Sequence, residues 1–309
     1  MYTMKTDTTS CCGLDLQKDY FSIIQYSAAE RAVTLLSIKP FSDREDAHVW
    51  KTWREELKKN RGSLRFFNPA VVCGMPSEHA VVKLVPLDAD EEHAVEAVEW
   101  ELGQQIGGPL DEYVFDFQEP EDGQRSAQRK VLAVAYRREL VNRMADLVRN
   151  VKMQPMVVDL DIFGLVNVFS ANYRERTDTA SLLVHSESEM TKLVMTRNGG
   201  FMNFHSFEHK SGSVDPAGYA SLLSSEIDRF LAMAKENGGR PDIFITGSYF
   251  QQDISREAFF EKVPGAELLD PFRAIKCQVK IDEHQIPKFS TQLAVAVGLA
   301  LRGAGSTAS

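Results

Sequence analysis

The stretch that decides the fold is residues 131–169, which read VLAVAYRRELVNRMADLVRNVKMQPMVVDLDIFGLVNVF. Alternating apolar residues predict a strand over Arg129–Tyr136, and helical spacing predicts an amphipathic helix over Glu139–Val151. A further strand is predicted over Met156–Leu160, and a helix over Ile162–Phe169. Strands and helices that alternate in this way are typical of an α/β protein.

The residues before this stretch complete a small α+β insertion. A strand is predicted over His79–Leu87, and Asp88–Glu92 places acidic residues in the first turn of the next helix, where the helix dipole favours them. The apolar face of that helix is predicted to comprise Val95, Val98, Leu102 and Ile106. A strand over Tyr113–Gln118 follows, and an acidic turn (Glu119–Gln124) separates it from the strand that begins at Arg129.

The first part of the chain is predicted to begin with a β-hairpin. Residues 20–38 are rich in β-branched and aromatic residues with a polar break, which predicts two strands. Ser42 and Glu45 form a capping box for a helix that should run to about Asn60, where Gly62 stops it. That helix is expected to bury Trp50, Trp53 and Leu57. A buried strand over Ala70–Cys73 follows.

The second part repeats this theme. Paired strands are predicted over Leu182–His185 and Lys192–Thr196, with Phe201–Phe207 as a third. A helix over Gly218–Asn237 follows, and a short buried strand over Ile243–Thr246 leads into a turn. The residues of this helix that should face the core are Leu222, Leu223, Ile227, Phe230 and Leu231. Two halves that each begin with a hairpin, and a final small-residue helix over Thr291–Arg302, indicate a duplicated α/β fold.

Composition narrows the class of protein and its partners. The 309 residues are 43% hydrophobic and 26% charged, as in soluble globular proteins. The net charge of −9 argues against nucleic acid or an anionic membrane surface as the main partner. No apolar run approaches the ~20 residues that span a bilayer, and the first residues lack a signal-peptide pattern, so we expect a cytoplasmic location. The four cysteines, which we interpret as reduced thiols, are Cys11, Cys12, Cys73 and Cys277.

Five segments, in order, resemble the PilM family of type IV pilus assembly proteins. The first three are VCGMPSEHAVVKLVPL (72–87), EAVEWELGQQIGGPLDEYVFDFQ (96–118) and the stretch over 131–169. The last two are ELLDPF (267–272) and VAVGLALR (295–302). The resemblance extends over roughly Gly13–Arg302.

The resemblance implies the actin-like ATPase fold, which is α/β with duplicated RNase H-like domains around a cleft. It places the first domain at residues 1–78, with residues 156–178 returning to it. The small α+β insertion in the first domain would span 79–160. The second domain would span 179–309, with a helical insertion at about 210–240 and a C-terminal helix that packs back.

The two phosphate loops of such a fold are degenerate here. Glycine is needed in these loops because backbone N–H groups must approach the phosphate oxygens closely. The family's first loop, G-x-D-x-G-S, corresponds to residues 13–18, where Asp15 is kept but Gln17 replaces a glycine. The second, D-x-G-A-x-x-T, corresponds to residues 185–191, where only Thr191 is kept. His185 replaces its aspartate, and Glu187, a carboxylate that would face phosphate, replaces its glycine.

The adenosine motif is half kept, as Gly247 followed by Ser248 in place of a glycine pair. Together with the two phosphate loops, this predicts that Asp15, Gln17, Thr191, Gly247 and Ser248 are vestigial nucleotide-site positions. We therefore expect no cofactor, no catalytic residue and no metal. The alternative is a working ATPase, in which ATP and Mg²⁺ control partner binding.

Other residues have simpler interpretations. We expect Asp161 to cap the helix that follows it, and Asp159 to be a structural carboxylate of the family. His205 and His209 are four residues apart, but the residues around them predict a strand and a loop rather than a helix, so no metal pair is expected. A sugar-kinase-type enzyme would need a catalytic aspartate in a sugar pocket, and no motif for one is present.

The sequence therefore favours a non-catalytic cytoplasmic scaffold of a type IV pilus or related secretion machine. The resemblance implies that it binds the N-terminal cytoplasmic tail of a PilN-like inner-membrane protein, and so lies at the inner membrane only through that partner. We expect the strand Ala70–Cys73 and the insertion between about His79 and Gln118 to line the groove for this tail. Whether the chain forms homo-oligomers stays open.

Overall fold

The computed structural model describes most of the chain, namely residues 10–41, 49–61, 69–87, 94–118, 129–176, 178–209, 215–234, 240–279 and 289–305. The predicted capping box at Ser42 and Glu45, the stop at Gly62, the acidic turn Asp88–Glu92 and the turn at 119–124 lie outside these residues.

The chain forms two compact units. The main unit comprises Met1–Met75 and Val148–Ser309, and the inserted unit comprises Pro76–Leu147. The bounds differ from the 79–160 expected for the insertion because β8 (Gln154–Leu160) pairs in parallel with β4 (Ala70–Met75), which ties residues 154–160 to the sheet of the main unit.

The first lobe of the main unit is built on a six-stranded sheet in the order β14-β3-β2-β1-β4-β8. Its hairpin strands are β1 (Ser10–Leu16), β2 (Tyr20–Ser27) and β3 (Ala32–Pro40), and the short β14 (Lys276–Cys277) extends the far edge. Helix α1 (Val49–Asn60) buries Trp53 and Leu57, whereas Trp50 is only half-buried. The two strands predicted over 20–38 are confirmed, and β1 is an additional strand.

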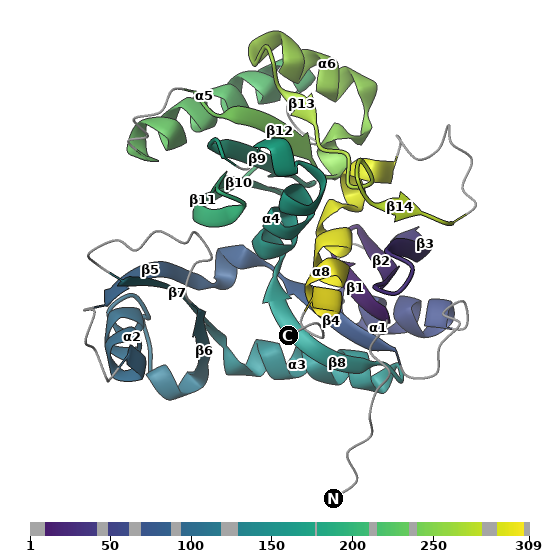
Figure 1. Ribbon diagram of the computed structural model, residues 1–309, viewed down its shortest axis with the longest axis vertical. Helices are drawn as coiled ribbons and strands as arrows, with labels where there is room; N and C mark the ends of the chain where they lie inside the picture. The colour runs from purple at the N-terminus through teal and green to yellow at the C-terminus, as the bar shows by residue number, and fades with distance from the viewer. Residues whose placement is uncertain are drawn as a thin grey trace, which may run out of the picture. The chain divides into compact units, whose positions relative to one another are not determined.

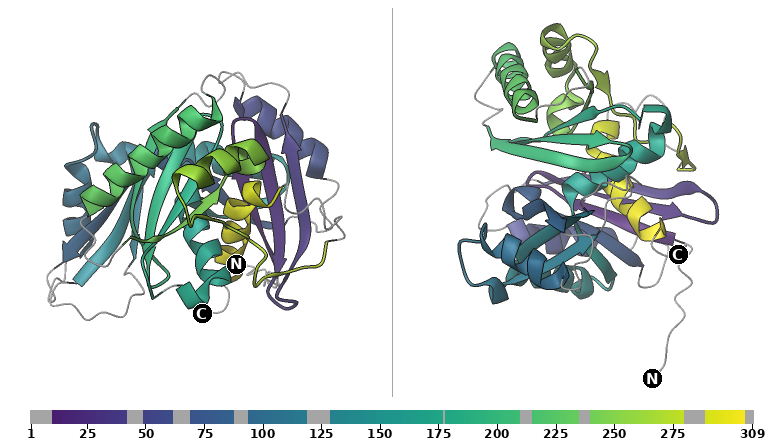
Figure 2. Two further views of the ribbon diagram at one scale, coloured as in Figure 1. Left: turned by 90° about the horizontal axis from the view of Figure 1, so that it is seen from above. Right: turned by 60° about the vertical axis from the view of Figure 1, so that its left-hand side comes forward.

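The second lobe is built on a five-stranded sheet in the order β11-β10-β9-β12-β13. Its strands are β9 (Ser181–Ser186), β10 (Met190–Arg197), β11 (Gly200–Glu208), β12 (Asp242–Thr246) and β13 (Glu267–Leu268). Helices α5 (Pro216–Ala234) and α6 (Asp253–Lys262) cover one face (Figure 2), where their apolar residues form a buried cluster with β9, β10 and β12.

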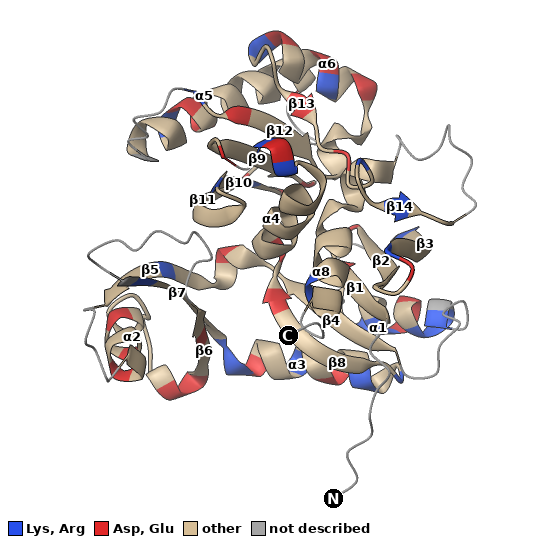
Figure 3. Ribbon diagram, in the orientation of Figure 1, with Lys and Arg blue, Asp and Glu red and all other residues tan. Residues whose placement is uncertain are grey.

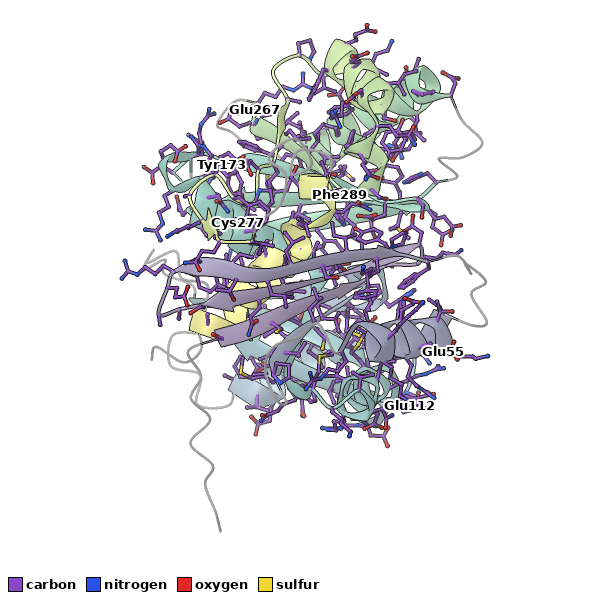
Figure 4. All side chains as sticks on the ribbon, turned by 90° about the vertical axis from the view of Figure 1, so that its right-hand side faces the viewer. Glu55, Glu112, Tyr173, Glu267, Cys277 and Phe289 are labelled. Atoms are coloured by element: carbon purple, nitrogen blue, oxygen red, sulfur yellow. The ribbon has the colours of Figure 1, made fainter. Side chains whose placement is uncertain are left out.

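Two helices lie between these sheets (Figure 1). Helix α8 (Ala294–Gly305) packs against β1, β2 and β4, and helix α4 (Asp161–Asn172) packs against α8, β10 and β11. The far end of α4 belongs to the second lobe, because Phe169 and Tyr173, the latter labelled in Figure 4, both pack against Phe244 of β12. The small-residue helix at the end of the chain is confirmed, although it begins at Ala294 rather than Thr291.

Glycines allow α8 to approach its neighbours. A Cβ atom at Gly298 would overlap the carbonyl oxygen of Gly164 on α4, and one at Gly13 on β1 would overlap the backbone of α8 at Ala296 and Ala300. Any side chain at these positions would push the elements apart. The two lobes therefore share a core in which backbone meets backbone.

The inserted unit is a three-stranded sheet with one helix on it. The order β5-β7-β6 is antiparallel throughout, with β5 (Val81–Leu87), β7 (Arg129–Arg137) and β6 (Tyr113–Gln118). Helix α2 (Ala94–Gly103) covers one face, where Val98, Leu102 and Ile106 pack on Val85 and its neighbours. Helix α3 (Arg138–Asn150) follows β7 and continues into the main unit.

Two predictions of inward-facing residues were wrong. Val95 on α2 is 49% exposed, and Leu222 on α5 is 40% exposed. Leu222 lies beside the buried stripe of Leu223, Ile227 and Phe230 rather than in it, because successive helical residues point about 100° apart.

We predict that Gly298→Ala lowers the free energy of unfolding by at least about 2 kcal/mol, since overpacking a tight core costs about 1–3 kcal/mol and here the clash is with backbone. Gly305→Ala is the matched control, because a Cβ at Gly305 on the same helix meets no atom within 4 Å. Chemical denaturation of both variants measures the difference, and equal stabilities would show that α4 and α8 are less tightly packed than described.

Candidate functional site

The first loop of the candidate site is the β1–β2 turn, and its polar groups bond to the protein itself. The Gln17 side-chain amide donates to Asp15 (Nε2–Oδ1 2.8 Å), and the Gln17 backbone N–H donates to the Tyr20 carbonyl at 3.0 Å. The indole of Trp53 donates to the Gln17 carbonyl at 2.9 Å. Gln17 therefore closes a turn that a phosphate-binding loop would leave open to its ligand.

Asp15 is buried at the end of β1. It is 2% exposed, and its Oδ2 atom has no hydrogen-bond partner among the described residues. Burial, together with the nearby charge of Asp161, raises the pKa of Asp15 to about 7. The carboxyl is thus kept, but in surroundings that favour its neutral form.

The second loop, the β9–β10 turn, is closed by Glu187. Its backbone N–H donates to the Met190 carbonyl at 2.9 Å. Its carboxyl accepts hydrogen bonds from Tyr20 (Oη–Oε1 3.0 Å) and from the backbone N–H of Ser248 (3.3 Å). The side chain is buried, and His185 Nε2 lies 3.1 Å from its Oε1 atom. The Glu187 side chain thus contacts β2 at Tyr20, the end of β9 at His185, and the residue after Gly247.

Burial sets the charge of these two side chains. Burial raises the pKa of Glu187 to about 8, and burial together with the charge of Lys192 lowers the pKa of His185 to about 3. At neutral pH the pair is therefore a neutral carboxylic acid beside a neutral imidazole.

Thr191 and Gly247 are placed by structural contacts. The Thr191 hydroxyl is buried, donates to Ser186 Oγ at 2.9 Å and hydrogen-bonds to the Tyr219 hydroxyl. Gly247 has φ +104°, its N–H donates to the Thr291 carbonyl at 2.9 Å, and a Cβ there would overlap Ser186. The Glu187 carboxyl thus joins Tyr20 and Ser248, and Gln17 bonds to Asp15, while Thr191 bonds within a buried cluster of hydroxyl groups.

Aromatic side chains pack beside Ser248. The rings of Tyr219 and Tyr249 are 4.4 Å apart, and those of His209 and Tyr219 are 4.6 Å apart. His205 lies on β11 and His209 just after it, as the predicted strand and loop require. Among the described residues, no group of three His, Cys, Asp or Glu side chains could hold a metal ion.

A buried ion pair that sequence reasoning missed lies beneath the two turns. Lys192 on β10 binds the carboxylate of Asp161, and the two residues are 4% and 3% exposed. The prediction that Asp161 caps α4 was wrong, because Leu160 occupies the N-cap position and Asp161 is the first helical residue. A lysine next to the apolar run Leu193–Met195 of a predicted strand was the available signal, since buried lysines need a partner.

Asp159 has a structural role. Its Oδ1 atom accepts from the Leu160 N–H at 2.8 Å, and its Oδ2 atom lies 3.4 Å from Arg302 of α8. A surface ion pair at the mouth of the cleft, Lys18 with Glu189 (2.6 Å), also joins the two turns.

Comparison with known proteins identifies the family of this chain. Residues 43–201 match the sequence model of the family described as type IV pilus assembly protein PilM. A comparison with curated proteins found no matching sequence. The chain is similar to the solved PilM-PilN type IV pilus biogenesis complex, with a TM-score of 0.81 and 20% identity over 95% of this chain and 98% of that one.

More distant structures share the fold. One is a Bacteroides thetaiotaomicron protein described as having an actin-like ATPase fold, with a TM-score of 0.54 and 11% identity over 88% of this chain and 95% of that one. Another is the cytoplasmic domain of EpsL, an inner-membrane component of the Vibrio cholerae type II secretion system, with a TM-score of 0.52 and 9% identity over 77% and 82%. The predicted actin-like ATPase fold is thus confirmed.

We predict that Lys192→Met lowers the free energy of unfolding by about 3–5 kcal/mol, because it leaves the Asp161 charge buried without its partner. The double variant Lys192→Met with Asp161→Asn should recover part of this loss. Lys59→Met is the control, since it removes an exposed pair with Glu56 (3.0 Å) that contributes about 1 kcal/mol or less. Additive effects of the two changes at Lys192 and Asp161 would contradict the coupling.

Proposed function

The chain belongs to the PilM family of type IV pilus assembly proteins, and on this premise we propose that it is a non-catalytic scaffold. It would bind the short cytoplasmic tail of a PilN-like inner-membrane protein and thereby lie on the cytoplasmic side of that membrane. The observation that supports this most is the match, over nearly the whole chain, to a PilM solved together with PilN. No described helix is long and apolar enough to span a membrane.

The non-catalytic part of the proposal rests on how the cleft uses its hydrogen-bond donors. The backbone N–H groups of Gln17, Glu187, Gly247 and Ser248 all donate to protein acceptors. A nucleotide would have to displace these bonds and the Glu187 carboxyl, at a cost in unpaired buried groups. The competing proposal, a nucleotide-controlled ATPase, has the retained Asp15 in its favour.

Titration calorimetry with Mg-ATP tests the non-catalytic reading. We expect no measurable heat of binding up to millimolar nucleotide, because the backbone donors of Gln17, Glu187, Gly247 and Ser248 already donate to protein acceptors. The double variant Gln17→Gly with Glu187→Gly serves as the comparison, since it restores both family glycines. Micromolar binding by the wild-type chain would favour the ATPase instead.

The expected contribution of strand Ala70–Cys73 to the partner groove was wrong. This strand, β4, lies between β1 and β8, so both of its hydrogen-bonding edges are occupied. Its residues Val71, Val72 and Cys73 are fully buried. An extended peptide needs a free strand edge or an accessible face, and β4 offers neither.

The inserted unit has a strand edge and a sheet face that a peptide could use. Among the described residues, β6 pairs with β7 only, so its other edge is open to a further strand. The sheet face opposite α2 carries half-buried apolar residues, which include Val82, Leu84, Val114 and Val134. We place the tail along this edge and face, with main-chain hydrogen bonds to β6 and apolar anchors on the face.

Charge supports a tail of this origin. Cytoplasmic segments next to membrane spans are enriched in Lys and Arg. In the inserted unit, carboxylates lie on α2 and on the turn before β6, as Figure 3 shows. On β6 itself Asp116 is exposed. A basic tail would therefore be attracted to this edge.

We predict that Val114→Asp and Asp116→Lys each weaken binding of the labelled tail peptide about tenfold, by placing a charge on the apolar face or by reversing the charge at the edge. Glu257→Lys on α6 is the control, because it makes the same charge change on the main unit. Fluorescence anisotropy measures the dissociation constants. Loss of binding in Glu257→Lys with full binding in the other two would put the groove on the main unit.

A further inference from the structure

Trp100 on α2 is the most exposed large apolar side chain among the described residues, with 66% of its surface exposed. Val95, on the same helix, is 49% exposed. Gly103 follows Trp100 one turn later, and a Cβ atom there would meet nothing within 4 Å, so the space beside the ring is open. An exposed tryptophan of this kind is typical of a contact surface, because Trp is enriched where proteins bind one another.

The face of α2 that carries Trp100 is acidic. Glu96, one turn before Trp100, is exposed, and Glu99 beside it is half-buried. The ten residues of α2 include three glutamates and no Lys or Arg. A partner that fits this face therefore brings positive charge next to an aromatic ring.

Helix α1 of the main unit has the complementary surface. Lys51, Arg54 and Lys58 are exposed and follow one another at spacings of three and four residues, so they form one stripe. Glu55, labelled in Figure 4, is exposed beside this stripe. Arginine stacks well on an aromatic ring, because its guanidinium is planar and weakly hydrated. Figure 3 shows the basic residues of α1 in blue and the acidic residues of α2 in red.

Other arginines on the surface pair with carboxylates of their own lobe. These pairs include Arg176 with Asp242, Arg229 with Glu226 and Arg273 with Glu175. The stripe on α1 therefore fits the acidic face of α2 better than they do. A chain with a net charge of −9 repels its own copies, so a contact between copies needs a local match of this kind.

We propose that the outer face of α2 binds helix α1 of a second copy of this chain. In this contact the Arg54 guanidinium lies on the Trp100 ring. Lys51 and Lys58 face the carboxylates beside the ring. Trp100 supplies most of the affinity, because a large ring leaves water, whereas the exposed ion pairs mainly orient the copies. Since the contact joins different surfaces of the two copies, it can repeat from copy to copy.

This contact is separate from the site proposed for the tail. The tail lies along β6 and on the sheet face opposite α2, which leaves the outer face of α2 to the second copy. One chain can therefore hold the tail and a neighbouring copy together, and each contact can be tested without the other.

Analytical ultracentrifugation of the full chain, from micromolar to millimolar concentration, tests for the contact. We expect the average mass of the wild-type chain to rise with concentration. Trp100→Ala should weaken this association at least about tenfold, because it removes the apolar anchor. Ile254→Ala on α6 is the control, since it removes an apolar side chain that is 60% exposed on the second lobe and should keep the wild-type association.

Charge reversal identifies the two surfaces. Glu96→Lys with Glu99→Lys gives a chain in which α1 and α2 are both basic, and Lys51→Glu with Arg54→Glu gives a chain in which both are acidic. We expect neither chain to associate with itself, whereas their equimolar mixture should associate. Each pair of substitutions changes the net charge of −9 by four, so both chains stay negative and their net charges do not attract each other.

A wild-type chain that stays monomeric at every concentration would overturn the proposal, and so would a mixture of the two reversed chains that does not associate. Association that survives Trp100→Ala and both charge reversals would place the contact elsewhere on the chain, which also overturns it. The labelled tail peptide is measured on Trp100→Ala as well. We expect wild-type affinity for the peptide in this variant, so a failure of either proposal is distinguished from a failure of the other.

Discussion

The close contact of α4 with α8 is the constraint on which the main unit depends. Gly164 and Gly298 meet backbone to backbone, and Gly13 brings β1 equally close to α8. Because α4 follows a strand of the first sheet and packs on strands of the second, this contact fixes where the two sheets can lie. The β1–β2 and β9–β10 turns then face each other across the cleft, and their side chains decide what the cleft can do.

The backbone donors at Gln17 and Glu187, in these two turns, bond to protein acceptors rather than staying free to bind phosphate. A cleft with glycine turns leaves backbone N–H groups for phosphate oxygens. Here the backbone N–H of Gln17 donates to the Tyr20 carbonyl, and the backbone N–H of Ser248 donates to the Glu187 carboxyl. The cost of burying Glu187 is reduced because it stays neutral, and the cost of burying Lys192 is offset by Asp161. The network is only partly satisfied, because buried side-chain atoms of Asp15, Ser22, His185 and Thr291 have no hydrogen-bond partner among the described residues.

The inserted unit is stabilised separately from the main unit. It has its own small core between α2 and one face of a three-stranded sheet. An antiparallel sheet covered by a helix on one side leaves its edges and its other face to be used. In the inserted unit, β6 pairs with β7 alone among the described residues, and this is the edge that we propose for the partner.

The sequence by itself determined where several of the strands and helices lie. Periodicity placed β5, β6, β7 and α3 within a few residues, because period 2 and period 3.6 are local properties of the chain. The expectation that Gln17 and Glu187 stand at glycine positions of the family's loops also came from the sequence alone, since it needs only the motif, and it stays a prediction. Tertiary structure alone decided the partners. Tyr20 and Glu187 are 167 residues apart in the chain, and Lys192 and Asp161 are 31 apart, so no local pattern links either pair. It also decided that Val95 is exposed, because helical spacing gives the direction of a side chain but not how far the sheet beneath it extends.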